Sequence, residues 1–179
     1  MCWEKIAAKS LRDKVELKTE DRSPSGIYKW WAERDDLLLI LKKLGVVERI
    51  DIENEIEHKK IADKEMYCIY VGQAEDLKVR LKKHIRGSVN NSTLRKSLGA
   101  ILWTGENSEE LKKRINAFMD RLLIKYKLVE KARLNMEESD EISKSLRILN
   151  IDGYNHKIFM QYIDKPLSDL REKFKILEK

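Results

Sequence analysis

Two tyrosines and one arginine stand where they could act on the same chemical group. Gly26-Ile27-Tyr28 lies at the start of one predicted strand, and Tyr70-Val71-Gly72 lies at the end of another. Arg80 follows Gly72 by eight residues, inside a predicted helix. A guanidinium grips a phosphate with a fixed fork of donors, which a lysine would do only as a point charge. A phenol, with a pKa of about 10, becomes a base at neutral pH when a neighbouring cation lowers that pKa. These residue types can bind an anionic group and accept a proton from it or from water.

The charge of the chain is unevenly distributed around these residues. The 179 residues carry 37 Lys and Arg against 31 acids, a net charge of +6. Between residues 78 and 96 there are seven basic residues and no acid, whereas residues 33–65 hold ten acids and seven bases. The basic run predicts a face that contacts phosphates, although a solvated helix face is the alternative. We expect phosphate contacts from Lys78, Lys82, Lys83, Arg86, Arg95 and Lys96, and an anion-binding helix start at Ser92 and Thr93.

The elements that must position these residues are short strands separated by helices. Hydrophobic spacing predicts strands at Ile27–Ala32, Tyr67–Val71 and Lys125–Met136. It predicts helices at 2–20, 35–44, 77–85, 93–102, 108–123, 137–146 and 166–177. The helix at 35–44 should end at Gly45, Asp76 should cap the helix that carries Arg80, and a turn is expected at 150–155 around Gly153. The pattern indicates a mixed α/β chain.

Adjacent tryptophans follow the first motif. Neighbouring strand residues point to opposite faces, so one of Trp30 and Trp31 is expected in the core and the other is free to be exposed. Stacking of an exposed indole on an unpaired base is the functional alternative to packing.

The residues that carry these motifs resemble the GIY-YIG nuclease family. Gly26-Ile27-Tyr28 matches the first motif of the family name, and Tyr70-Val71-Gly72 matches the second with one Ile-to-Val change. The segment 91–100 is similar to one in small bacterial members, and the segment 149–153 resembles the one that follows the catalytic helix of the family. The resemblance implies an α/β (α+β) fold with a small three-stranded, mainly antiparallel sheet flanked by helices.

The resemblance also implies a metal site. In the family a glutamate precedes the closing asparagine by about three helical turns, and Glu138 lies twelve residues before Asn150. Glu138 is then the ligand of Mg²⁺ (or Mn²⁺), for which a carboxylate is a suitable hard ligand. Glu137 and Glu141 are neighbours that compete for this assignment. Asn150 would close the core of the site.

The other catalytic roles follow from the same resemblance. Tyr28 is the expected general base that activates water, and Tyr70 would position water or phosphate. Arg80 would stabilise the charge that gathers on the phosphate. His84, one helical turn beyond Arg80, would assist proton transfer or orient a tyrosine. Gln73 departs from a lysine that often follows the glycine of the second motif.

The length fits one domain with appended segments. We expect an N-terminal helical arm over 1–24, a nuclease-like domain over 25–155 with an insert at about 33–66, and a C-terminal helix over 156–179 packed on that domain. The insert is a packing excursion, a dimer contact or a device that limits which DNA enters. The alternatives stay open, as does homodimer formation.

Composition excludes several classes of protein. The longest apolar run, Leu37–Leu41, is far shorter than the ~18 residues of a membrane span. No signal peptide begins the chain, so a cytoplasmic location is expected. Cys2 and Cys68 are too few for a disulfide framework or a cysteine zinc site, and the three histidines have no metal-ligand spacing. No motif indicates an organic cofactor.

These features together predict a metal-dependent endonuclease that hydrolyses DNA phosphodiester bonds by in-line attack of a tyrosine-activated water. Restriction-type and repair-type roles both fit. The alternative is a non-catalytic DNA- or RNA-binding module that keeps the fold.

Overall fold

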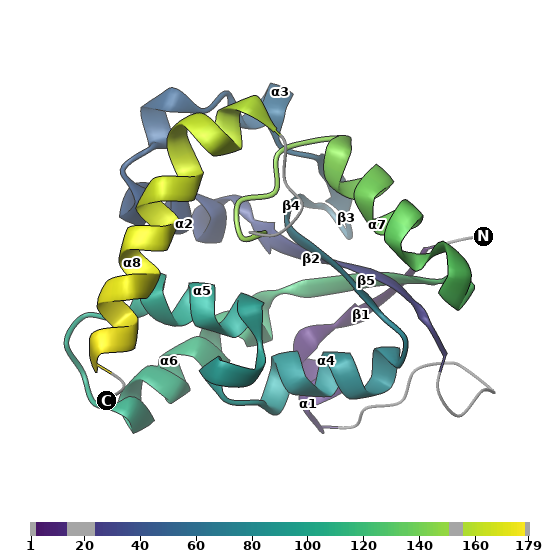
Figure 1. The fold of residues 1–179 in the computed structure, drawn as a ribbon, viewed down its shortest axis with the longest axis horizontal. Coiled ribbons are helices and arrows are strands. Elements are labelled where there is room, and N and C mark those ends of the chain that lie inside the picture. Colours follow the sequence, from purple (N-terminus) through teal and green to yellow (C-terminus); the bar gives the residue numbers. More distant parts are fainter. Residues whose placement is uncertain (1–2, 14–23, 151–155, 178–179) are drawn as a thin grey trace.

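The centre of the molecule is a single antiparallel sheet. A computed structural model describes residues 3–13, 24–150 and 156–177. Five strands follow the order β1-β5-β2-β4-β3, with every neighbouring pair antiparallel (Figure 1). The strands are β1 (Glu4–Ala7), β2 (Gly26–Glu33), β3 (His58–Ile61), β4 (Lys64–Ala74) and β5 (Leu123–Leu128). The fold is α+β, but the prediction of three strands is wrong because β1 and β3 add an edge on each side.

The first edge strand overturns part of the expected N-terminal helix. The spacing of Trp3, Ile6 and Leu11 favours a helix, yet residues 4–7 pair with β5, and the helix within the described residues 3–13 is α1 (Ala8–Asp13). Hydrogen bonds to a strand more than 110 residues away outweigh the local preference. The division of the chain into an arm, a central domain and a C-terminal helix stays a prediction.

Helices surround the sheet. They are α2 (Arg34–Leu44), α3 (Ile52–Glu55), α4 (Leu77–Arg86), α5 (Thr93–Leu102), α6 (Ser108–Arg121), α7 (Leu134–Ser143) and α8 (Asp164–Leu177), and a π-helical turn, Phe159–Ile163, precedes α8. Two predicted helix ends are confirmed, and in each case a residue at the end itself determines it. Gly45 ends α2 with φ 70°, and the Asp76 carboxylate accepts the Val79 N–H at 2.8 Å. Asn107 caps α6, and its side chain accepts the N–H groups of Glu109 and Glu110. No helix in the described ranges is long and apolar enough to cross a membrane.

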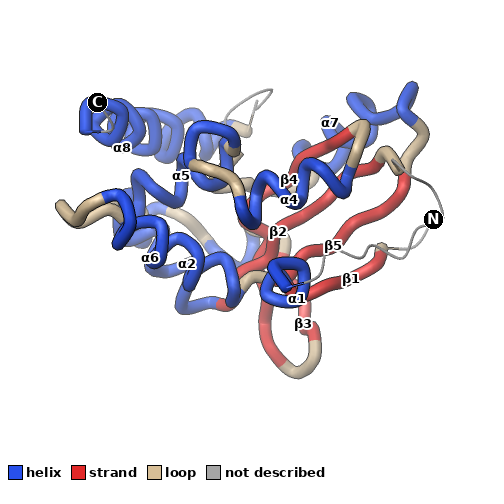
Figure 2. Tube along the Cα trace, turned by 90° about the horizontal axis from the view of Figure 1, so that it is seen from below, coloured by secondary structure: helices blue, strands red, loops and turns tan. Residues whose placement is uncertain are grey.

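The two faces of the sheet carry different helices. Helices α1, α4, α5 and α6 lie below the sheet in Figure 1, and α7 lies above its right-hand end; Figure 2 shows α4 and α1 in front of the sheet. Successive residues of β2 therefore serve different layers, because strand side chains alternate. Tyr28 contacts His84 of α4, whereas Lys29 contacts Glu141 of α7.

Trp30 and Trp31 lie at a register shift in the sheet and are buried on opposite faces of it. The pairing of β2 with β4 moves from Trp30↔Tyr70 to Trp31↔Cys68. Trp30 packs against His84, with ring centroids 5.8 Å apart, and Trp31 lies under two lysines on the other face. Both indoles are fully buried, so both tryptophans pack in the core, and the alternative of an exposed indole that stacks on a base is wrong.

The third predicted strand is shorter than expected. Alternation continues from Lys125 to Met136 in the sequence, but β5 ends at Leu128, and α7 already begins at Leu134. The predicted turn at 150–155 falls, apart from Asn150, outside the described residues.

The insert at 33–66 belongs to the core. It contains α2, a 3₁₀ turn at Val47–Arg49, α3, β3 and the start of β4. Leu37, Ile40 and Leu41 of α2 are fully buried. Of the alternatives for the insert, packing is the one that these contacts support.

Candidate active site

A small pocket unites the residues of the two motifs. It has a volume of about 190 Å³ and lies where β4, α4 and α7 approach one another. The lining residues are Tyr28, Tyr70, Gly72, Gln73, Arg80, Thr93, Glu138 and Asn150. The structure thus brings together five of the six residues predicted as catalytic, and the sixth, His84, lies directly behind Tyr28.

Tyr28 is the centre of the hydrogen-bond network. Its hydroxyl oxygen lies 2.7 Å from His84 Nε2 and accepts the Arg80 Nε–H at 3.2 Å. Its ring is stacked near Tyr70, with centroids 6.4 Å apart. Burial raises the pKa of Tyr28 well above its usual value, the nearby Tyr70 raises it further, and Arg80 lowers it. Tyr28 can therefore act as a base only to the extent that hydrogen-bond donors at its oxygen lower its pKa.

His84 is buried and carries no charge near pH 7. Burial lowers the pKa of His84 well below its usual value, and Arg80 and Arg95 lower it further, so the ring is neutral near pH 7. Ser92 Oγ accepts the Arg95 N–H and lies 2.6 Å from His84 Nδ1. Ser92 Oγ has a second lone pair, so the contact with Nδ1 fits either tautomer of the neutral ring. Arg80 donates to the Tyr28 oxygen, and this hydrogen bond favours the phenolate.

Ser92 and Arg95 depart from their predicted role. Both are nearly fully buried, at 2% exposed, and cannot reach a phosphate on the surface. Arg95 donates to the carbonyl oxygens of His84 and Ile85 at 3.2 Å, and to Asn116 at 2.9 Å. The two residues hold His84 in place instead. Their charge and hydroxyl made them candidates, but only the fold reveals that they face inward.

The other predicted phosphate-binding residues between 78 and 96 are accessible to solvent. Lys82, Lys83 and Arg86 are exposed on α4, while Lys78, Thr93 and Lys96 are half-buried. Thr93 lines the pocket at the first residue of α5. Phosphate contact by this group stays a prediction.

Gly72 is required because the Tyr28 ring lies over it. The two residues are paired across β2 and β4, and a Cβ added to Gly72 would lie 2.5 Å from the Tyr28 hydroxyl oxygen. The strand continues past this glycine to Ala74, so its role is to leave room and not to end the strand.

Gly72→Ala is expected to displace the Tyr28 hydroxyl from His84 and Arg80. Misplacement on the order of 1 Å costs a reaction about 10²-fold, and we expect a loss of that size in single-turnover cleavage. Overpacking should also lower the free energy of unfolding by about 1–3 kcal/mol, which urea denaturation measures. An unchanged rate would contradict the position of the ring.

Asn150 supports the pocket through the backbone of β4. Its Oδ1 accepts the Val71 N–H at 2.8 Å, and its Nδ2 donates to the Val71 carbonyl oxygen at 2.7 Å. The side chain thereby satisfies the N–H and the carbonyl oxygen of Val71, which lies between Tyr70 and Gly72. The expected closing role fits these contacts, whereas the broader assignment as a catalytic residue becomes one of positioning.

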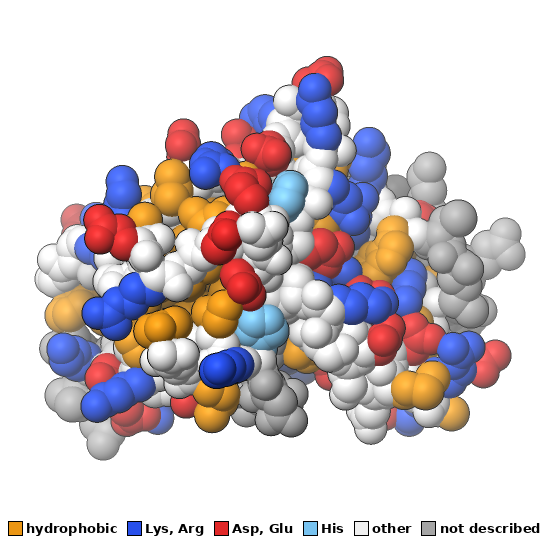
Figure 3. Space-filling model, turned by 90° about the horizontal axis from the view of Figure 1, so that it is seen from above, with side chains coloured by type: hydrophobic (Ala, Val, Ile, Leu, Met, Phe, Trp, Pro, Cys, Tyr) orange, Lys and Arg blue, Asp and Glu red, His pale blue; other side chains and the backbone are white. Residues whose placement is uncertain are grey.

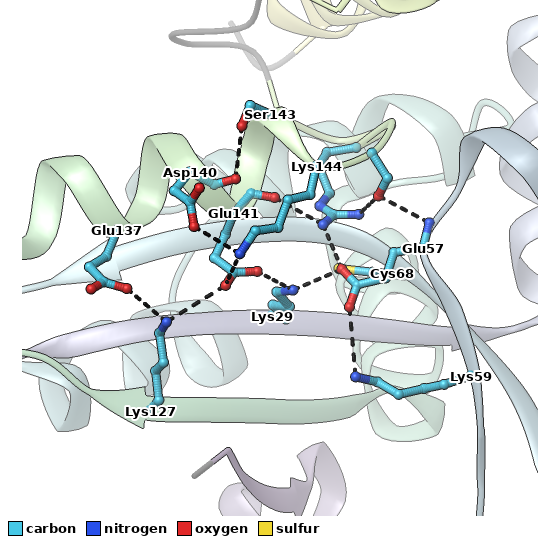
Figure 4. Close-up of polar contacts among 12 residues, drawn as sticks. Lys29, Glu57, Lys59, Cys68, Lys127, Glu137, Asp140, Glu141, Ser143 and Lys144 are labelled. Carbon is cyan, nitrogen blue, oxygen red and sulfur yellow. Dashed lines mark hydrogen bonds and ion pairs between the residues drawn. The ribbon is translucent and has the colours of Figure 1, made fainter. Parts of the chain in front are cut away.

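The structure separates Glu138 from the two acids that compete with it. Glu137 and Glu141, one helical turn apart, face the sheet, where Glu137 binds Lys127 at 2.8 Å and Glu141 binds Lys29 at 2.5 Å (Figure 4). Glu138 lines the pocket instead. Gln73, which stands at the position of the expected lysine, donates to Asn135 at 2.6 Å and so connects the pocket to α7.

A buried ion network holds α7 against the sheet. Lys29 binds Glu57 at 2.8 Å, and the fully buried Arg147 binds the same carboxylate at 2.6 Å (Figure 4 shows this cluster). Burial would raise the pKa of Glu141, but hydrogen bonds from Lys29 and Lys144 outweigh it and lower that pKa to about 2. The ionised form of Glu141 therefore stabilises the fold above about pH 4.5, and this contribution is lost as the pH falls toward 2.

Lys29→Met is expected to destabilise the protein by about 3–5 kcal/mol at pH 7, because it removes the buried cation that Glu141 and Glu57 share. In the variant, Glu141 loses the hydrogen bond that lowers its pKa most, so its pKa rises and protonation should relieve the penalty as the pH falls. The difference from wild type should be smaller at pH 4 than at pH 7 in urea denaturation. Lys144→Met is the control, since Lys144 is half exposed and solvent screening limits its effect to about 1 kcal/mol or less.

A second group of metal-capable side chains lies on the insert. One ligand atom each from Glu53, His58 and Glu65 falls within 4.8 Å of the others, a grouping that the sequence spacing did not indicate. All three residues are exposed. The Glu53 carboxylate already accepts hydrogen bonds from Arg34 and from the Tyr67 hydroxyl, the latter at 3.1 Å. These residues are absent from the lining of the pocket.

Comparison with known proteins gives one match. A protein-family model described as GIY-YIG catalytic domain matches residues 26–173 of the 179 residues. The matched stretch begins with the first residue of β2 and includes every residue that lines the pocket. No curated protein and no solved structure matches the chain significantly.

Proposed function

The chain belongs to the GIY-YIG catalytic domain family, a family of nucleases, and on that premise we propose that it is a metal-dependent endonuclease that hydrolyses DNA phosphodiester bonds. The observation that carries the proposal is the pocket in which Tyr28, Arg80 and Glu138 meet. A base, a cation for the phosphate and a metal-binding carboxylate are the groups that this hydrolysis needs.

The donor set of the pocket fits one divalent cation that keeps most of its waters. Among the described residues that line it, Glu138 is the one carboxylate, and it is half-buried. Mg²⁺ is commonly held by one or two carboxylates together with water and substrate phosphates. Asn150 is neutral and its amide already bonds both backbone groups of Val71, so the charged Glu138 is the stronger ligand. We therefore assign Mg²⁺ (or Mn²⁺) to Glu138 rather than to the exposed group around His58. When bound, the ion would supply charge stabilisation at the phosphate.

The protein side chains account for the proton and for the orientation of the phosphate. Tyr28, whose oxygen accepts from Arg80 and lies beside His84 Nε2, takes the proton of the attacking water. Arg80 stays charged and directs its guanidinium at both phenols, from where it also contacts the negative charge of the phosphate. Tyr70, which lines the same pocket with its ring stacked near that of Tyr28, orients water or phosphate.

Nicking of supercoiled plasmid tests the proposal. We expect the purified chain to convert the plasmid to open circles with Mg²⁺ and to lose this activity in EDTA. An Arg80→Ala preparation, purified in parallel, controls for contaminating nucleases and should be inactive. Salt-sensitive DNA binding without any cleavage would contradict an enzyme and would identify a binding module that keeps the fold.

A further inference from the structure

Lysines meet one another across the face of the sheet that lies opposite Tyr28. Lys5 of β1 is paired with Lys125 of β5, and Lys125 is paired with Lys29 of β2. Three like charges therefore stand directly opposite one another on three neighbouring strands. Such pairs destabilise a sheet, and folded proteins usually balance them with acids.

Among these three lysines, Lys29 is the one whose charge is neutralised by carboxylates of the described residues. Lys29 binds both Glu57 and Glu141, whereas no carboxylate of the described residues lies within ion-pair distance of Lys5 or Lys125. Lys59 of β3 extends the group, and its own ion pair, with Glu57, is long at 3.7 Å. That carboxylate is already shared by Lys29 and Arg147.

The Trp31 indole lies beneath the ammonium groups of Lys59 and Lys125. The Lys59 ammonium lies 4.3 Å from the centre of the indole, and that of Lys125 lies 5.8 Å away. Cation–π attraction offsets part of the repulsion, but it does not involve Lys5. Burial lowers the pKa of Lys125, and the charges of Lys59 and Lys5 lower it further against the weaker effect of Glu57. An excess of positive charge thus remains, which an anion would neutralise.

The surroundings indicate an extended anion. Lys5 is exposed, and Lys59 and Lys125 are half-buried, so all three retain access to solvent. Figure 3 looks down on this face of the sheet, where Lys and Arg side chains follow one side of the projecting β3–β4 hairpin and acidic side chains follow the other. Cations that run across several strands, about 4.8 Å apart, suit a linear chain of phosphates better than one small ion.

We propose that Lys5, Lys59 and Lys125, the lysine patch, form a second contact for a DNA backbone, separate from the pocket. The inference rests on the proposed function, because DNA is the polyanion that the enzyme would meet. Side chains of β2 alternate between the face of Tyr28 and the face of the patch, so the patch contacts a stretch of DNA other than the one being cut. The enzyme would hold long or branched DNA at two places.

DNA binding by a charge-depleted variant tests the patch. The full chain carries Lys5→Gln, Lys59→Gln and Lys125→Gln, and the matched control carries Lys42→Gln, Lys43→Gln and Lys113→Gln, which are exposed on α2 and α6. Both are measured by fluorescence anisotropy with a duplex of about 30 base pairs over a range of salt. Three lost phosphate contacts should reduce the salt slope by about 2–3, at about 0.9 for each contact, and the affinity by at least tenfold.

Two further readouts separate a binding role from a structural one. The patch variant should cleave with an unchanged kcat and a raised KM, since the patch does not touch the reacting group. Without DNA its Tm should equal or exceed that of wild type, because the substitutions remove repulsion. A salt slope and KM equal to those of the control, or a lower Tm with a reduced kcat, would overturn the patch. A wild-type chain that neither binds nor cuts DNA would instead refute the proposed function itself.

Discussion

Glu138→Gln is expected to reduce strand cleavage by at least about 10³-fold, because several kilocalories per mole of charge stabilisation depend on the metal site. The amide keeps the volume of the side chain, so the pocket should keep its shape. The substitution removes the negative charge that binds a divalent cation. Cleavage is measured in single turnover with excess enzyme, over a series of Mg²⁺ concentrations.

Glu137→Gln supplies the control for this experiment, since it makes the same chemical change one residue away. Glu137 binds Lys127 and Arg133 and faces away from the pocket. Its loss should lower stability slightly and leave the Mg²⁺ dependence of cleavage unchanged. Equal losses in the two variants would mean that α7 supplies structure alone. Full activity of Glu138→Gln would place the metal elsewhere.

Local signals in the sequence predicted the elements whose ends are set by their own residues. Gly45 ends α2 in the left-handed region, and the side chains of Asp76 and Ser92 cap α4 and α5. These interactions span three or four residues, so they are visible without a fold. The order of Tyr28, Tyr70, Arg80 and Glu138 along the chain was likewise enough to select residues that line one pocket.

Long-range pairing and burial were beyond the reach of the sequence pattern. Residues 4–7 have helical spacing, but their partners in β5 lie far along the chain, and that pairing decides their conformation. Arg95 resembled a surface cation until the fold placed three hydrogen-bond acceptors around its guanidinium. The difference between Glu138 and Glu141 has the same origin, because the direction of each carboxylate depends on how α7 lies on the sheet.

Tyr28→Phe is expected to lower the rate of cleavage by about 10²–10⁴-fold, the usual contribution of a general base. The wild-type rate should also carry the signature of that base. Burial raises the pKa of Tyr28 well above its usual value, so the phenolate is a minor species at neutral pH. Its fraction, and with it the rate at saturating metal, should rise about tenfold for each pH unit between pH 6 and 9.

The slope distinguishes a base from a packing residue. In Tyr28→Phe the residual rate should lose its dependence on pH, while Tyr126→Phe should keep both the rate and the slope. Tyr126 is the matched control because it is buried, lies directly opposite Tyr28 on β5 and donates to Glu4 at 2.8 Å, away from the pocket. His84 is neutral across this range, since burial lowers its pKa, and so adds no second rise. A slope that survives in Tyr28→Phe would assign the proton transfer to another group, and Tyr70→Phe would then be the variant in which the slope should disappear.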